Sequence, residues 1–378
     1  MNDHNYIEYN FCKNSIYKNI SDYKEAEKIV NSNSLISCLV IKSNNLSNDK
    51  TILDYKIIEC ADKICIDRSL IVFENIINLI KKFDIKNKKD IYIFHYKGNA
   101  CTKKNFPYKL LSSSRKIGYN NIILWPTIFL CKSNIIKTPY YHHDATYFMD
   151  DDFIDETWEN KKPIFFFRGI NSGNPFPSVK LSWNFERESR TKLFFEHLKL
   201  SDEYIKMCDI SFDRLYPDSE TLNKIITDKV EYKSIAIQEN WIFNKDKTID
   251  DLKNEIKILM ENTKKHISLT EIFQHKFLFC LEGFDVSSIL NIVLCSNSLA
   301  IMPKMYYENT IINSSYLKPY VHYVPIKEDF SNLEEVIKWC LDNDDKCKEI
   351  IKNANEYSKI FLNENKMLNL LCNLIKKF

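Results

Sequence analysis

A regular alternation of strand-like and helix-like segments, clearest after residue 162, most constrains how this chain can fold. The runs "IFFF" (164–167), "KFLFCLE" (276–282) and "LAIMP" (299–303) are short and apolar, which is typical of buried strands. The segment "TIDDLKNEIKILMEN" (248–262) has apolar residues at helical spacing instead. Strands that alternate with helices predict parallel sheets joined by right-handed crossovers.

The same patterns predict further elements in both halves of the chain. Additional helices are expected at 68–83, 188–198, 287–296 and 331–343, and additional strands at 35–43, 90–96 and 321–326. Ser331 and Glu334 have the spacing of a capping box at the start of the last of these helices. The alternation therefore predicts an α/β protein with two Rossmann-like domains that face a cleft.

A polar, acidic stretch from Asp150 to Lys162, ended by Pro163, is the best candidate for a linker. We expect domains at 1–155 and 156–360, followed by a C-terminal helix at 361–378. The run "MDDDF" in this stretch holds Asp150 and Asp152, which resemble the D-x-D metal site of GT-A transferases. We interpret these two aspartates as solvated linker residues and expect no metal site.

The charge balance and the cysteines exclude several classes of protein. The net charge of +2 does not favour a grip on nucleic acid, which needs a concentrated basic surface. The first residues lack the layout of a signal peptide, and no stretch approaches the roughly 18 apolar residues of a membrane span. The 12 cysteines include no C-x-x-C pair and are expected to be reduced thiols. We therefore expect a cytoplasmic protein.

Glycines follow predicted strands at two places, although the chain has only five glycines. Arg168 and Gly169 follow "IFFF", and Gly283 follows "KFLFCLE" just before Ser287. Ligands bind beyond the carboxyl ends of strands in open α/β sheets, where glycine lets the backbone approach an anion and arginine supplies a fork of donors. Free N–H groups at a helix that starts near Ser287 would add to a phosphate site. The alternative is two ordinary turns and a surface arginine.

These residues resemble a known family. The segments "WENKKP" and "FFFRG" (158–169) are similar to the W-x-x-K and FFRG signatures of glycosyltransferase family 90. The segments "HKFLFCLEGFDVSSILNIVLCSNSLAIMPKMYYE" (275–308) and "LKPYVHYVPIKEDFSNLEEVIKWCLDNDD" (317–345) resemble later motifs of that family, especially in bacterial members that modify lipopolysaccharide. The resemblance extends in order from residue 158 to about residue 360 and is weak before residue 140.

The resemblance implies a GT-B-like architecture, with an N-terminal acceptor domain and a C-terminal domain that holds the nucleotide-sugar. It implies transfer of a sugar, commonly glucose or xylose, from a UDP-sugar to a hydroxyl group of a glycan or lipopolysaccharide-type acceptor. Family members invert the anomeric centre and need no metal or other cofactor. A glycolipid acceptor would bring such an enzyme to the periphery of a membrane.

Residues that match the family motifs are candidates for donor binding. They are Arg168, Gly169, Arg190, Lys276, Glu282, Gly283, Asp285, Ser287 and Glu308. Arg168 would neutralise the leaving diphosphate, or it would simply pair with the acidic linker. Arg190 is either a second diphosphate contact or a solvated helix residue. Asp285 would accept hydrogen bonds from hydroxyl groups or cap a helix, and Glu308 would reach the rim of the cleft or lie on the surface.

A general base is harder to find. Inversion by direct displacement needs a group that takes the proton of the acceptor hydroxyl, and the predicted strand at 90–96 runs on without an acid. Asp144, in "YYHHDATYF", is the catalytic candidate to test first. Ile289 also stands where protein O-glucosyltransferases have an arginine. The alternative function is therefore a catalytically inactive relative that binds nucleotide or glycan as an interaction module.

Overall fold

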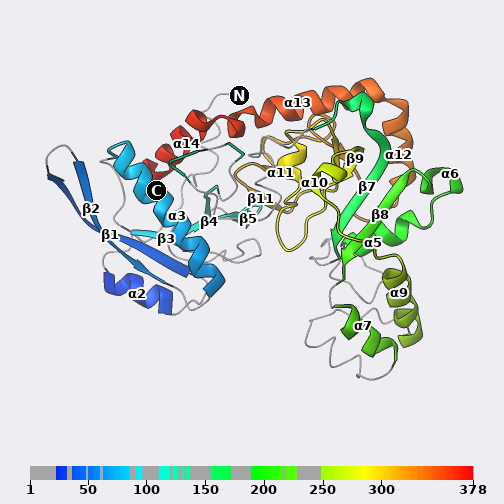
Figure 1. Ribbon diagram of the computed structural model, residues 1–378, viewed down its shortest axis with the longest axis horizontal. Helices are drawn as coiled ribbons and strands as arrows, with labels where there is room; N and C mark the ends of the chain where they lie inside the picture. Colours follow the sequence, from blue (N-terminus) through cyan, green and yellow to red (C-terminus); the bar gives the residue numbers. More distant parts are fainter. Residues whose placement is uncertain are drawn as a thin grey trace. The chain divides into compact units, whose positions relative to one another are not determined.

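The computed structural model describes residues 23–31, 36–47, 50–59, 63–85, 91–95, 110–119, 122–126, 130–131, 133–136, 155–171, 189–215, 218–227 and 248–377. The chain divides into two compact units (Figure 1). Unit 1 contains 1–152, 306–314 and 357–378, and unit 2 contains 153–305 and 315–356.

Unit 2 is built on a five-stranded sheet in which every neighbouring pair of strands is parallel. Its strands are β7 (Lys162–Ile170), β8 (Cys208–Arg214), β9 (His275–Phe279), β10 (Leu299–Met302) and β12 (Val324–Pro325). Their order across the sheet is β12-β10-β9-β7-β8. The chain adds β8 on one side of β7 and then β9 on the other side, so the winding reverses between β7 and β9. The predicted parallel sheet is confirmed in this unit.

Helices connect and flank these strands. They are η1 (Trp158–Asn160), α5 (Ser189–His197), α6 (Asp202–Ile205), α7 (Ser219–Ile226), α9 (Ile249–Glu261), α10 (Leu269–Ile272), α11 (Leu290–Val293), α12 (Leu333–Asp342) and α13 (Asp344–Leu362). Two expectations about the helices of this unit are wrong, one about a length and one about a cap. The helix expected at 287–296 is a single turn, and α12 begins after Asn332 without a side-chain cap, so Ser331 forms no capping box.

Aromatic side chains fill the core of unit 2 along β7 and its neighbours. The ring of Phe165 stacks on that of Phe277 in β9, with centroids 4.2 Å apart, and Trp158 meets Phe277 edge-on at 5.5 Å. Phe167 packs edge-on against Phe212 of β8 at 6.1 Å. Burying a phenylalanine contributes roughly 1.5–3 kcal/mol. The aromatic run of β7 thus holds the central strand of this sheet in place.

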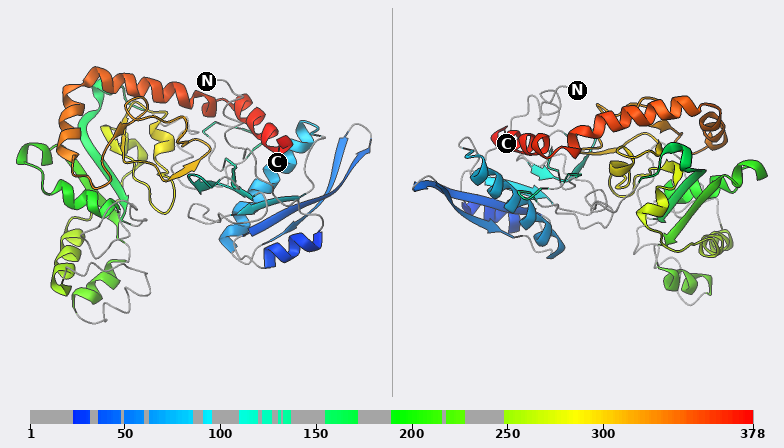
Figure 2. Two further views of the ribbon diagram at one scale, coloured as in Figure 1. Left: turned by 180° about the vertical axis from the view of Figure 1, so that it is seen from behind. Right: turned by 45° about the horizontal axis from the view of Figure 1, so that its top comes forward.

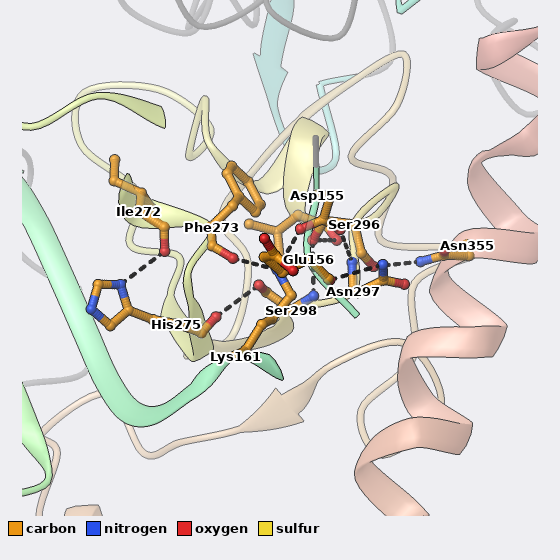
Figure 3. Close-up of polar contacts among 11 residues, drawn as sticks. Asp155, Glu156, Lys161, Ile272, Phe273, His275, Ser296, Asn297, Ser298 and Asn355 are labelled. Atoms are coloured by element: carbon orange, nitrogen blue, oxygen red, sulfur yellow. Dashed lines mark hydrogen bonds and ion pairs between the residues drawn. The ribbon is translucent and has the colours of Figure 1, made fainter. Parts of the chain in front are cut away.

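A network of hydrogen bonds with one ion pair connects the amino ends of these strands (Figure 3). The buried ammonium group of Lys161 pairs with Asp155 and donates to the main-chain carbonyl of Phe273. Asp155 also accepts the main-chain N–H of Asn297, and the hydroxyl of Ser298 donates to the carbonyl of His275 at 2.8 Å. The W-x-x-K and Ser-Asn-Ser residues of the sequence motifs therefore have a structural role at the edge opposite the carboxyl ends.

Unit 1 contains a mixed sheet rather than the expected parallel one. Its strands are β1 (Ile36–Ser47), β2 (Lys50–Ile58), β3 (Ile91–His95), β4 (Leu110–Ser112) and β6 (Ile122–Leu124), in the order β2-β1-β3-β4-β6. β1 is antiparallel to both β2 and β3, whereas β3, β4 and β6 are parallel. The β1–β2 hairpin accounts for the difference, since a strand that returns directly must run antiparallel.

Helices cover both faces of this mixed sheet (Figure 2). α2 (Tyr23–Asn31) packs through Ala26 onto the face that carries Ile93. α3 (Lys63–Lys82) packs through Phe73 against Phe94, which points to the other face. α14 (Glu364–Lys377) lies against α3. Within the described residues, no helix is long and apolar enough to cross a membrane.

A second, two-stranded sheet in unit 1 joins β5 (Ser114–Lys116) to β11 (Tyr307–Asn309), which is antiparallel to it. Arg115 of β5 forms an ion pair with Glu308 of β11, with Nε and Oε1 2.9 Å apart. The other carboxylate oxygen of Glu308 accepts a hydrogen bond from Ser314 at 3.2 Å. A short segment from the second half of the sequence is thus part of the N-terminal unit.

Candidate functional site

The candidate site lies at the carboxyl edge of the unit 2 sheet, where the winding reverses between β7 and β9. In open parallel sheets this reversal leaves a crevice at the carboxyl ends of the two strands, and ligands bind there. β7 brings Arg168, Gly169 and Ile170 toward this edge, and β9 leads into the segment Leu281–Ser287. The structure therefore brings most of the predicted donor-binding residues to one edge of one sheet.

Arg190 lies at the reversal point itself. It is the second residue of α5, and its guanidinium donates to the main-chain carbonyl of Ile170 at 3.0 Å and to that of Leu281 at 3.1 Å. These carbonyls belong to the end of β7 and to the segment that follows β9. One guanidinium fork thus joins both strands of the crevice, and it places a fixed positive charge between them.

The segment after β9 is compact. The main-chain N–H of Gly283 donates to the carbonyl of Asp285 at 3.1 Å, and the Asp285 carboxylate accepts the N–H of Val286 at 2.6 Å. Glu282 and Ser287 are buried, with 8% and 4% of their surfaces exposed. Asp285 stabilises this turn and does not cap α11, which starts five residues later. A helix of one turn offers little of the phosphate cradle that the sequence predicted.

Arg168 is paired in a way that the sequence did not indicate. Its Nη2 lies 2.8 Å from Oδ1 of Asp209 on β8, and its guanidinium stacks over the ring of Phe166. Its partner within the described residues is therefore a residue of β8 and not the described part of the acidic linker (155–162). The side chain is only 4% exposed, and its Nε and Nη1 have no hydrogen-bond partner among the described residues. Buried donors of this kind are rare, so the three N–H groups on these two nitrogens remain available for an acceptor.

Asp209 is held ionised between two cations. Lys264 also lies 2.8 Å from Oδ1 of Asp209. Burial acts to raise the pKa of Asp209, but Lys264 and Arg168 outweigh it, and the net effect is a lowered pKa. The charge of Arg168 is thus compensated on the β8 side of β7, whereas Arg190 lies on the β9 side. Of the two arginines, Arg190 has the more direct access to the reversal point.

Gly169 does not have a backbone conformation that favours glycine. It lies within β7 without a positive φ angle, and among the described residues a Cβ atom there would meet only the ring of Phe167, at 3.8 Å. Neither strain nor packing against the described residues therefore requires glycine at this position.

Lys276 lies near the other edge of the unit 2 sheet, and Glu308 belongs to unit 1. Lys276 is near the amino end of β9, where its ammonium group lies over the ring of Trp158 at 4.6 Å and 3.8 Å from Asp344. Glu308 is fully buried in unit 1, where Arg115 and Ser314 bind its carboxylate, so it lies neither on a rim nor on the surface. These two residues have structural contacts that the sequence motifs did not reveal.

Several sequence candidates lie outside the described residues. They are Asp144 and the pair Asp150 and Asp152. Across the part of the chain that the structure describes, no group of three or more His, Cys, Asp or Glu side chains could hold a metal ion. The expectation of a metal-independent reaction stays a prediction.

Comparison with known proteins identifies the later part of the chain. Residues 230–378 match the model of "Glycosyl transferase family 90". We call residues 230–378 the family 90 region. The family 90 region contains Glu282, Gly283, Asp285 and Ser287, and it begins after Arg190 in the sequence. The resemblance deduced from the motifs is confirmed for this region.

Individual relatives agree with the family assignment. The chain is 34% identical over 98 residues to "O-glucosyltransferase LpsA" of Dichelobacter nodosus, and this alignment covers 26% of this chain and 30% of the relative. It is 29% identical over 98 residues to "Protein O-glucosyltransferase 2" of Danio rerio, with coverage of 26% and 19%. "Uncharacterized protein 179R" of Invertebrate iridescent virus 6 is 28% identical over 188 residues, with coverage of 45% and 16%. The matches thus span less than a third of each relative.

Sequence reasoning missed Asp209 and Arg115, the partners of two predicted site residues. Asp209 lies in "CDISFDR" (208–214), where polar and apolar residues alternate as in a strand with one polar face. This alternation, which lies shortly before the family 90 region in the sequence, could have predicted the strand. Arg115 had no comparable signal, because its strand is three residues long and pairs with a segment 193 residues away.

Proposed function

We propose that this chain is a glycosyltransferase that moves a sugar from a UDP-sugar to a hydroxyl group of a glycan or lipopolysaccharide-type acceptor, with inversion at the anomeric carbon. The family 90 region and its O-glucosyltransferase relatives support the transfer of a sugar. The observation that carries the proposal is the guanidinium of Arg190, held between the carboxyl ends of β7 and β9. This is the position at which open α/β sheets bind nucleotides.

The arginines suit the chemical demand of this reaction. When the bond between the sugar and the diphosphate breaks, negative charge grows on the leaving diphosphate, and preorganised positive groups stabilise that charge. Arg190 would supply the fixed charge, and Nε and Nη1 of Arg168, which have no partner among the described residues, would supply additional donors. Protein cations in these positions would replace the metal ion that other transferases use.

The segment Glu282–Ser287 would hold the remainder of the donor. A carboxylate accepts two or more hydrogen bonds, so Glu282 and Asp285 suit hydroxyl groups of the ribose or of the sugar. Glucose is the first donor sugar to test, because two relatives carry the name O-glucosyltransferase. Xylose is the second. Asp144 is the candidate base that the sequence offers, and the unit 1 residues would bind the acceptor.

Calorimetry with UDP, UDP-glucose, UDP-xylose and GDP-mannose tests the donor site directly. We expect binding of the uridine compounds, and weaker binding in Arg190→Ala protein that unfolds at the same temperature as the wild type. A transfer assay with and without EDTA then tests the reaction, and activity should survive EDTA. If no nucleotide-sugar binds and no sugar is transferred or hydrolysed, the proposal fails. Binding of the donor without any turnover would favour the inactive relative instead.

A further inference from the structure

A histidine–aspartate pair lies beside the candidate site and has no part in the functions described above. Nδ1 of His266 lies 2.7 Å from Oδ2 of Asp213. The Asp213 side chain is 7% exposed, whereas that of His266 is 78% exposed. A buried carboxylate thus holds one nitrogen of an imidazole whose ring is largely open to solvent.

The pair lies at the same edge of the sheet as Arg190. Asp213 is the second-last residue of β8, whose neighbours Phe212 and Arg214 are in register with Gly169 and Ile170 of β7. Arg190 donates to the carbonyl of that same Ile170. Adjacent strands are roughly 4.8 Å apart, so the pair lies on the order of two strand spacings from the reversal point. A donor held at the reversal point could extend along this edge.

The segment that carries His266 is anchored to β8. The N–H of Lys264 donates to the carbonyl of Phe212 at 2.8 Å, and the carbonyl of Asn262 accepts from the hydroxyl of Ser211. The position of the imidazole is therefore fixed by the edge of the sheet rather than by a free loop. Fixed positions of this kind give catalytic groups their geometric precision.

The contact with Asp213 selects the tautomer of His266. A carboxylate accepts, so Nδ1 carries the hydrogen and the neutral ring keeps its lone pair on Nε2. The other oxygen of Asp213, Oδ1, is buried without a hydrogen-bond partner. The imidazole is thus the side chain that this buried carboxylate contacts within the described residues. This is the arrangement by which a buried aspartate prepares a histidine to act as a base.

We propose that His266 is the general base of the sugar transfer, positioned by Asp213. As the acceptor oxygen bonds to the anomeric carbon, Nε2 of His266 takes the hydroxyl proton, and the bond from that carbon to the diphosphate breaks with its electron pair leaving on the diphosphate. The inference rests on the function proposed above. It supplies a second candidate beside Asp144 for the base that the sequence motifs do not provide.

The pair also has a purely structural reading. His266 and Asp213 would then only help the segment 262–266 to cover the edge of β8. Several charged residues adjoin the pair: Lys265 precedes His266, Arg214 follows Asp213, and Lys264 pairs with Asp209 on the same strand. Glu271 of α10 has a pKa lowered mainly by its hydrogen bonds to Ser268, with smaller contributions from Lys265 and His266. A structural role predicts lower stability and unchanged turnover, whereas a catalytic role predicts the reverse.

The test uses the full chain and three variants, with the donor sugar that the wild type transfers or hydrolyses. His266→Gln should lower kcat by roughly 10²- to 10⁴-fold and leave the affinity for UDP unchanged. Asp213→Asn should lower kcat as well, because it no longer fixes the tautomer. Lys265→Gln is the matched control and should behave as the wild type.

The outcomes separate the inference from the proposed function. If the wild type turns over and His266→Gln protein keeps its kcat, His266 is not the base, while the glycosyltransferase function stands. A loss confined to Asp144→Asn protein would assign the base to Asp144 and overturn the inference in the same way. If the wild type neither binds nor turns over any nucleotide-sugar, the proposed function fails and the inference fails with it.

Discussion

Arg115 and Glu308 form a buried ion pair across 193 residues of sequence, with Nε of the arginine 2.9 Å from Oε1 of the glutamate. The Arg115 side chain is 3% exposed and that of Glu308 is 1% exposed. Arg115 also donates to the carbonyl of Ile122, at the start of β6. The pair therefore ties β11 to two strands of unit 1, and it assigns a structural role to a glutamate that sequence motifs place in a donor site.

Replacing one partner of this pair should destabilise the protein without weakening donor binding. Glu308→Gln leaves the guanidinium of Arg115 buried without its countercharge, which should lower the free energy of unfolding by on the order of 3–5 kcal/mol. Urea unfolding followed by near-ultraviolet circular dichroism measures the loss, and Glu334→Gln on the exposed face of α12 is the control. Unchanged stability with a lost affinity for UDP would instead show that Glu308 contacts the donor.

Gly169→Ala should leave the protein folded and impair the binding of its ligand. The free energy of unfolding should change by no more than about 1 kcal/mol, because the new Cβ would meet only Phe167, at 3.8 Å, and no positive φ opposes it. If the glycine keeps space for the diphosphate, calorimetry should show clearly weaker binding of UDP. Normal affinity in the variant would mean that the crevice does not extend to Gly169.

Arg190→Lys should weaken donor binding more than a surface substitution does. An ammonium group cannot replace both guanidinium hydrogen bonds, to Ile170 and Leu281, with the same planar geometry. The segment after β9 would lose one of its anchors, and we expect the dissociation constant for UDP to rise about tenfold or more, which corresponds to about 1.4 kcal/mol. Lys199→Gln, at the exposed end of the same helix region, is the matched control.

Stability should fall when the pH is lowered from 7.5 to 5.5. Burial lowers the pKa of His197, His275 and His322 below the ordinary value of 6.5, although main-chain carbonyls of Phe194 and Ile272 partly oppose this for the first two. The folded protein holds these rings neutral, whereas the unfolded chain takes up protons below pH 6.5. The contribution of these rings to the free energy of unfolding is therefore fully present above pH 6.5, and it is lost as the pH falls toward their pKa in the folded protein.

The urea midpoint at pH 7.5, 6.5 and 5.5 measures this loss. Carboxylates titrate mostly below this range, near pH 4, so they contribute little to the change. His275→Gln protein should lose less stability than the wild type over the same interval. A midpoint that does not move with pH in the wild type would show that buried histidines do not govern stability in this range.

The sequence predicted the sheet of unit 2 well, because its strands are buried on both faces. Continuous apolar runs such as "IFFF" and "LAIMP" need no knowledge of the partner strand to be recognised, and both became strands of the parallel sheet. β8 was missed because it is an edge strand whose Asp209, Ser211 and Asp213 face polar partners. Its low hydrophobicity hid it, although its alternation was regular.

Long-range pairing explains what the sequence could not predict in unit 1. β4, β5, β6 and β11 each have three residues, so their hydrogen-bond partners rather than their own composition make them strands. At the candidate site, the motifs located the edge of the sheet correctly. They did not show that Arg168 would pair with Asp209, because that contact depends on which strand becomes the neighbour of β7.

The path of the chain through unit 1 limits how the protein can be dissected. Unit 1 is completed by 306–314 and 357–378, which the ribosome makes only after nearly all of unit 2. A fragment that stops near residue 152 would expose the edge of β5 and leave Arg115 without its countercharge. Neither unit should therefore be obtainable as one fragment by a single cleavage of the chain. After proteolysis between the units, the fragments should stay associated until denaturant is added.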